Sequence, residues 1–162
     1  MMQPDWGQPP SDKPLNLLLW TSRIYLRCVV NQKTPPVEHL KWAMALGDVD
    51  CAYNALTDYL NAMLVGSSET IQLHQPFCPC VSPHEQAFVT AVRSAQSGNL
   101  HGCAMSLNSV LQPATVRVCE PLIRRIAMAV AMAEANDGRA SQRAANTQAD
   151  HQGHGGHDRR LH

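Results

Sequence analysis

The sequence predicts an all-α protein: a bundle of five or six helices arranged as antiparallel helical hairpins, with disordered N- and C-terminal tails. Three observations lead to this prediction. Aromatic residues make up only 5% of the chain, whereas alanine, leucine and methionine, which favour helices, are frequent. Apolar residues recur every three or four positions along several segments, as they do on one face of a helix. Proline and glycine fall between those segments, where helices begin and end.

The first helix is predicted over residues 14–31, with its apolar residues on one face and with Arg23 and Arg27 on the other, polar side. A second helix is expected to begin at Pro36, because proline suits the first helical position. It is expected to stop at Gly47, which can adopt the left-handed conformation of a helix cap.

Asp48 is expected to cap a third helix that ends near Gly66. A polar loop over residues 67–81 follows. The fourth helix has the strongest start signal in the chain, a capping box in which Ser82 and Glu85 satisfy each other's backbone N–H groups. It is expected to break at Gly98.

Asn99 is expected to open a fifth helix that Pro113 closes, and a last helix is expected to begin or kink at Pro121. The turns at Gly47 and Gly98 each join two helices, and each is weakly similar to the turn of a tetratricopeptide-type hairpin. The similarity covers the short turns alone, because the aromatic and proline positions of that family are not recognisable. It therefore implies an architecture of stacked hairpins and no family membership.

The predicted domain organisation has three parts. Residues 1–13 form a proline-containing disordered segment, residues 14–136 a single helical domain, and residues 137–162 a polar, histidine-containing disordered tail. A chain of 162 residues is long enough for one domain with a substantial core.

The charge balance excludes two classes of partner. Thirteen basic residues match thirteen acidic ones, so the excess of Lys and Arg that binds nucleic acid or an anionic membrane surface is missing. No apolar run approaches the length of a membrane span, and no targeting signal is recognisable. We therefore expect a cytoplasmic protein whose six cysteines are reduced thiols or metal ligands.

The loop before the fourth helix contains the sharpest chemical feature, the run Cys78-Pro79-Cys80 with His74 and His84 on either side. Thiolate and imidazole ligands suit zinc or an iron–sulfur cluster, and copper(I) also accepts thiolates. A cysteine just before a helix N-terminus also gains thiolate character, so the same pair could form a disulfide and exchange thiols.

A Cys-x-Cys pair needs further ligands to complete a four-coordinate site, and the candidates are Cys103 and Cys119, with His101 as another. The alternative for those two residues is that they are small core residues on the apolar faces of their helices. Cys28 and Cys51 are expected to serve packing alone.

The tail carries four dispersed histidines, which could gather a divalent metal or could simply be solvated. They are His151, His154, His157 and His162.

Phosphate-binding loops, nucleophile elbows and metalloprotease motifs are not recognisable, so the sequence does not favour an enzyme. The leading hypothesis is a non-catalytic helical module that binds another protein, or a second copy of itself as a homodimer, through a helical face. The alternative is a metal-binding or metal-sensing protein that uses the loop containing Cys78 and Cys80.

Overall fold

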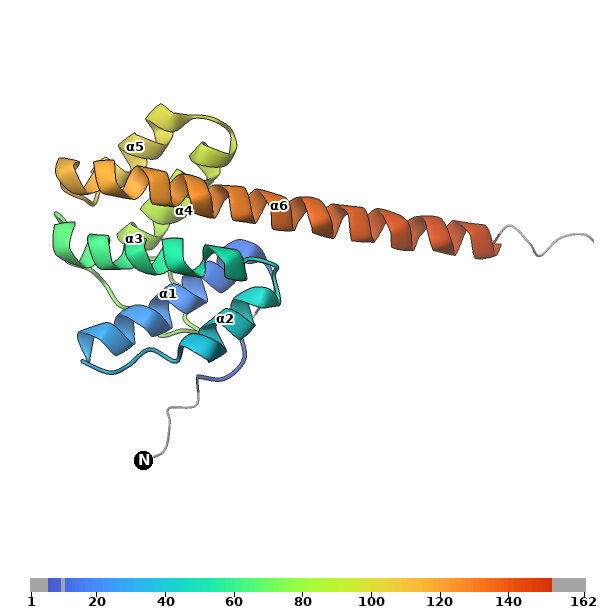
Figure 1. Cartoon of the computed structure of the whole chain (residues 1–162), viewed down its shortest axis with the longest axis horizontal. Helices are drawn as coiled ribbons and strands as arrows, with labels where there is room; N and C mark the ends of the chain where they lie inside the picture. The colour runs from blue at the N-terminus through green and yellow to red at the C-terminus, as the bar shows by residue number, and fades with distance from the viewer. Residues whose placement is uncertain (1–5, 10, 153–162) are drawn as a thin grey trace, which may run out of the picture.

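The longest helix that the structure describes, α6, packs against four of the other five helices. The computed structural model describes residues 6–9 and 11–152 of the chain. Helix α6 contacts α3 and α4 along its first half, and α1 and α5 less extensively. In Figure 1 α5 lies on one side of it and α1, α2 and α3 on the other, while α4 crosses behind it. In chain order the elements are α1 (Pro14–Val30), α2 (Val37–Ala45), the 3-10 turn η1 (Asp50–Ala52), α3 (Tyr53–Gly66), α4 (Pro83–Gln96), α5 (Leu100–Asn108) and α6 (Pro113–Gln152).

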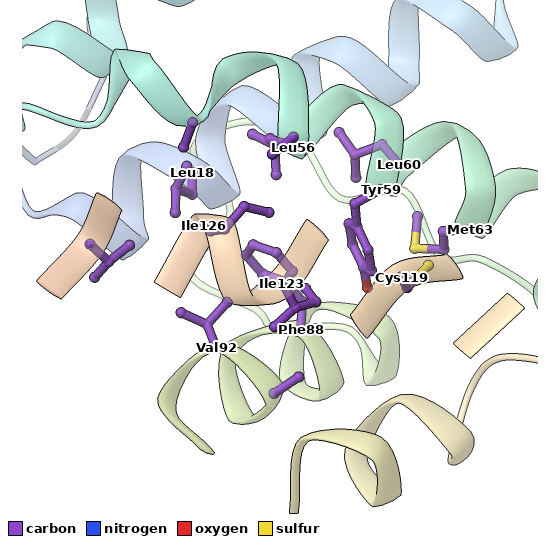
Figure 2. Close-up of a cluster of buried hydrophobic side chains, with 14 of the residues drawn as sticks. Leu18, Leu56, Tyr59, Leu60, Met63, Phe88, Val92, Cys119, Ile123 and Ile126 are labelled. Atoms are coloured by element: carbon purple, nitrogen blue, oxygen red, sulfur yellow. The ribbon is translucent and has the colours of Figure 1, made fainter. Parts of the chain in front are cut away.

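The core lies where α3, α4 and α6 meet. Figure 2 shows Ile123 of α6 between the α3 and α4 ribbons, with Tyr59 and Phe88 beside it. The Tyr59 and Phe88 rings are tilted, with centroids 5.2 Å apart. Each large apolar side chain buried in this way contributes about 1.5–3 kcal/mol relative to exposure. The predicted all-helical bundle is confirmed, and all of its described buried hydrophobic residues except Leu17 form one continuous cluster.

Three predicted helix boundaries are confirmed by their hydrogen bonds and backbone angles. Ser82 and Glu85 form the capping box at the start of α4, with the Glu85 N–H donating to Ser82 Oγ at 3.2 Å. Gly98 adopts φ +74° after α4, a conformation that glycine tolerates best. The Asn99 side chain accepts the N–H of Gly102 at 2.8 Å and so caps α5.

The turn after α2 differs from the prediction at two adjacent residues. Asp48, and not Gly47, has the left-handed conformation, with φ 57°. A Cβ at Gly47 would collide with the Leu17 side chain and lie 2.7 Å from the Asp12 carbonyl oxygen. Glycine is therefore needed at position 47 for space, while Asp48 supplies the turn and does not cap α3, which is preceded by η1.

Helix α6 begins earlier and ends later than expected. Pro113 is its first residue, the position where proline's missing N–H is no loss, and the helix continues through Pro121. The helical domain was expected to end at Asn136, but α6 continues to Gln152, because residues 137–152 are rich in helix formers such as alanine, glutamine and arginine. Residues 134–149 are all exposed, and this part of α6 projects from the bundle in Figure 1.

The N-terminal boundary also differs from the prediction, since Trp6, within the segment expected to be disordered, packs against the core. Within the described residues, no helix combines the length and apolar character needed to cross a membrane.

Candidate functional site

The loop between α3 and α4 is held against α1 by one buried arginine. Arg23 was expected on the polar side of its helix, but its side chain is only 9% exposed. This position of the helix faces the loop, so the guanidinium donates its hydrogen bonds to protein acceptors and not to water. Its Nη1 donates to the Cys78 carbonyl at 2.6 Å, and its Nη2 donates to the Cys80 carbonyl, also at 2.6 Å.

Longer bonds extend the same anchoring along the loop. Arg23 Nη1 also lies 3.3 Å from the Gln75 carbonyl oxygen and 3.4 Å from that of Pro76. One turn further along α1, Arg27 Nη2 donates to the His74 carbonyl at 3.1 Å. A loop without regular secondary structure is thus fixed from His74 to Cys80 by two side chains of one helix.

Glu85 balances the buried charge of Arg23. Arg23 Nε donates to Glu85 Oε1 at 2.6 Å, and Nη2 donates to Oε2 at 2.9 Å, a two-bond ion pair. This hydrogen bond raises the pKa of Arg23 against the opposing effect of burial. Glu85 Oε2 also accepts the Ser82 N–H at 3.0 Å. The same carboxylate therefore completes the capping box of α4 and holds the arginine that anchors the loop.

The two thiols of the loop interact with each other. The backbone N–H of Cys80 lies 3.3 Å from Cys78 Sγ, which accepts it. The hydrogen bond between the two side chains, together with that N–H and the charge of Arg23, lowers the pKa of Cys78. The pKa of Cys80 is raised, chiefly by the same side-chain hydrogen bond. Cys78 is half-buried and Cys80 is exposed.

The structure separates the other predicted cysteine ligands from this pair. Cys103 and Cys119 are buried in the core, at 1% and 0% exposure. Burial raises the pKa of both thiols, that of Cys119 to about 11. These placements match the alternative in which the two residues are small core side chains. Cys28 is buried as expected for packing, whereas Cys51 was expected to pack and is exposed.

The flanking histidines have surroundings of their own. His84 is buried, its Nε2 lies 2.6 Å from Ser67 Oγ, and its Nδ1 has no hydrogen-bond partner among the described residues. Burial lowers the pKa of His84. His74 is half-buried. Across the part of the chain that the structure describes, no three His, Cys, Asp or Glu side chains are grouped closely enough to hold a metal ion, and the metal site stays a prediction.

The tail histidines contribute nothing to this geometry. His154, His157 and His162 lie outside the described residues, and for His151 only the helical backbone is described.

A groove of about 750 Å³ lies between one end of the bundle and the projecting part of α6; we call it the α6 groove. Its apolar lining consists of Pro14, Leu15, Leu19, Leu46, Val81, Val89, Ala133 and Ala140. Its charged lining consists of Asp12, Lys13, Asp48, Arg93, Glu134 and Asp137.

A smaller cleft of about 310 Å³, the Cys78 cleft, adjoins the α6 groove and shares Asn16, Leu19 and Val81 with it. Trp20, Phe77 and Cys78 lie in the part that is not shared. Cys78 therefore lies in a concave, mainly apolar surface.

No family model matches the chain, and neither a curated protein nor a solved structure matches it.

Sequence reasoning missed the role of Arg23. Its helical periodicity placed it on a polar face, and its partner Glu85 is 62 residues away. The only signal in the sequence was the capping box, which identified Glu85 but gave no reason to pair it with α1.

Proposed function

We propose that the protein is an interaction module that binds a basic amphipathic helix of a partner protein in the α6 groove. The observation that carries the proposal is that one wall of an apolar groove is a helix that leaves the bundle. Leu46 and Val81 in the lining are each 50% exposed although they are large and apolar. An amphipathic helix laid into such a groove would remove these side chains from water.

The projecting part of α6 gives a second reason to expect a helical occupant. Residues 134–149 are exposed, so this stretch gains little from packing in the isolated chain. Helices of this length are marginal in water without tertiary contacts. A partner helix against Ala140 would supply such contacts.

The charges around the α6 groove favour a basic occupant. Four carboxylates and two cations line it, which leaves an excess of two negative charges (4 − 2 = 2). Lys13 pairs with Asp137 at 3.8 Å and Arg93 with Glu134 at 2.8 Å. The remaining acids are Asp12 and Asp48, and neither forms an ion pair among the described residues. Lysine or arginine flanking the apolar face of a partner helix would complement them.

The test uses a labelled peptide of leucine and lysine, about five helical turns long and with helical amphipathic spacing. Its binding to the full chain is followed by fluorescence anisotropy. We expect saturable binding, and we expect Leu46→Asp to weaken it at least about tenfold, the effect of losing one buried apolar contact. Val65→Asp is the matched control, because Val65 is 89% exposed and lies outside the α6 groove. A scrambled peptide of the same composition tests whether the amphipathic face matters.

Equal binding of the scrambled peptide, or no effect of Leu46→Asp, would overturn the proposal. Sedimentation of the unliganded chain tests a second copy as the occupant. A homodimer that Leu46→Asp dissociates would assign the α6 groove to self-association and would also overturn the partner-helix proposal.

The alternative function, metal binding or sensing by the loop around Cys78 and Cys80, remains a prediction. Elemental analysis of untagged protein, purified without a chelator or metal resin, is its direct measurement.

A further inference from the structure

The Cys78–Cys80 loop combines three features that a thiol–disulfide exchange site requires. The first is a pair of thiols in one loop, separated by the single residue Pro79. The second is a donor directed at one sulfur, the Cys80 N–H at 3.3 Å from Cys78 Sγ. A hydrogen bond to sulfur stabilises the negative charge of the attacking thiolate. The third is access, because Cys80 is exposed and Cys78 is half-buried beside a cleft.

The backbone of the pair is fixed independently of the thiols. Arg23 binds the carbonyl oxygens of both cysteines, each at 2.6 Å, and is itself held by Glu85. The guanidinium therefore sets the positions of the two residues without occupying either sulfur. Such a fixed arrangement reduces the entropy that must be lost when the sulfurs react.

The Cys78 cleft defines the substituent that a substrate could carry. Its lining includes the apolar side chains of Trp20 and Phe77, and Phe77 is 53% exposed. Arg23 is the one charged side chain in the described lining, and its donors are already used. An apolar peptide group fits these walls better than glutathione, whose carboxylates would find no free cation in that lining.

We propose that Cys78 and Cys80 exchange with the disulfide of a peptide that carries apolar residues, with Cys78 as the attacking thiol. This activity goes beyond helix binding and does not depend on it.

The reaction has two balanced steps. The Cys78 thiolate attacks one sulfur of the substrate R–S–S–R′; an S–S bond forms between Cys78 and R, and R′–S⁻ leaves and takes up a proton. Cys80 then loses its proton and attacks Cys78 Sγ, which forms the Cys78–Cys80 disulfide and releases R–S⁻, which is protonated in turn. The substrate gains two electrons and becomes two thiols, and the protein is oxidised by the same two electrons.

A disulfide across a single intervening residue closes a small ring. Strain in that ring makes the bond easy to reduce. We therefore expect a mild reductant to convert the oxidised pair back to the dithiol. An exchange site requires this reversibility, whereas a structural disulfide does not.

The experiment uses the full chain, reduced and treated with a chelator, and the disulfide-linked dimer of a short Phe-Cys-Leu peptide. Mass spectrometry is expected to show loss of two hydrogens in wild type, mapped to the peptide containing Cys78 and Cys80. Cys80→Ser is expected to trap the peptide on Cys78. Cys78→Ser is expected to slow the reaction at least about tenfold, because the sulfur that accepts the Cys80 N–H is lost. Cys51→Ser is the matched control and should react like wild type, because Cys51 is exposed and lies outside the loop.

Substrate preference is tested with glutathione disulfide as the second probe. We expect the apolar peptide disulfide to react at least about fivefold faster in wild type, and Phe77→Ser to abolish that advantage. Circular dichroism verifies that each variant is folded. The mass-spectrometric mapping of the oxidised cysteine pair uses wild type alone and does not depend on the folding of a variant. Modification of Cys51 as fast as of Cys78, or an untrapped Cys80→Ser variant, would overturn the dithiol mechanism. An unchanged preference in Phe77→Ser would overturn the assignment of the Cys78 cleft.

Discussion

Arg23 and Glu85 form a buried, two-bond ion pair that joins α1 to the first turn of α4, with Nε–Oε1 at 2.6 Å and Nη2–Oε2 at 2.9 Å. The same guanidinium holds the carbonyl oxygens of Cys78 and Cys80. The pair therefore connects two helices and the thiol loop through one side chain.

Replacing Arg23 by methionine should lower the free energy of unfolding by about 3–5 kcal/mol, because Glu85 would be left as a buried charge without its partner. Urea denaturation followed by circular dichroism measures the loss. Arg93→Gln breaks an ion pair whose side chains are 50% and 40% exposed. That change should cost no more than about 1 kcal/mol. Equal losses of unfolding free energy in the two variants would contradict the conclusion that the buried Arg23–Glu85 pair stabilises the fold more than the exposed pair does.

Acid should destabilise the fold through His84. Burial lowers its folded-state pKa below the ordinary value of 6.5. Well above that pH the residue is neutral in both states and has no effect. As the pH falls through the ordinary value, the unfolded chain takes up a proton before the folded one does, so stability decreases until the folded histidine also titrates.

The measurement compares urea midpoints at about pH 7.5 and about pH 5, on either side of the ordinary histidine pKa, in wild type and in His84→Gln. The variant should lose less stability on acidification, and His101→Gln, which alters an exposed side chain, should behave like wild type. A His84→Gln curve parallel to that of wild type would exclude this histidine as the cause.

The cysteines should divide into two classes of reactivity in the native protein. Cys51, Cys78 and Cys80 are accessible, and Cys28, Cys103 and Cys119 are buried. A short pulse of iodoacetamide, mapped by mass spectrometry, should label the first three, and all six should react in denaturant. Labelling of Cys119 in the pulse would contradict its place in the core.

Two glycine-to-alanine changes should have opposite signs. Gly138 lies in the exposed part of α6, and a Cβ added there would meet nothing within 4 Å among the described residues. Gly138→Ala should therefore raise local helix stability by about 0.5–1 kcal/mol. Gly98 is equally open, but its φ of +74° disfavours alanine. Gly98→Ala should therefore destabilise the protein by about 1 kcal/mol. Amide hydrogen exchange over the exposed part of α6 reports the first effect, and global unfolding reports the second.

Local signals in the sequence were sufficient for most of the fold. The capping box of Ser82 and Glu85 and the break at Gly98 each depend on residues within a few positions, and both are present as predicted. The steric requirement for glycine at position 47 was not predictable, because it depends on Leu17 and Asp12, which are close to Gly47 only in the folded chain. Helix α6 is longer than the polarity of residues 137–152 predicts, because those residues favour helix although they are polar.

The candidate site was predictable only in its chemistry. Cys78 and Cys80 stood out as a pair of thiols around a proline, and the structure shows the Cys80 N–H donating to Cys78 Sγ. The residue that positions them, Arg23, is 55 and 57 residues away in sequence and could be assigned only from the assembled helices.

Glu85 Oε2 accepts two hydrogen bonds, and these couple the local opening of two segments of the fold. One oxygen receives both the Ser82 amide of the α4 cap and the Arg23 guanidinium that holds the loop. Opening of the first turn of α4 would therefore displace the carboxylate that positions the guanidinium, and with it the hydrogen bonds that the guanidinium donates to the thiol loop. The two segments should behave as a single cooperative opening unit, so a ligand that reacts with the thiols would be sensed at the first turn of a helix in the core of the bundle.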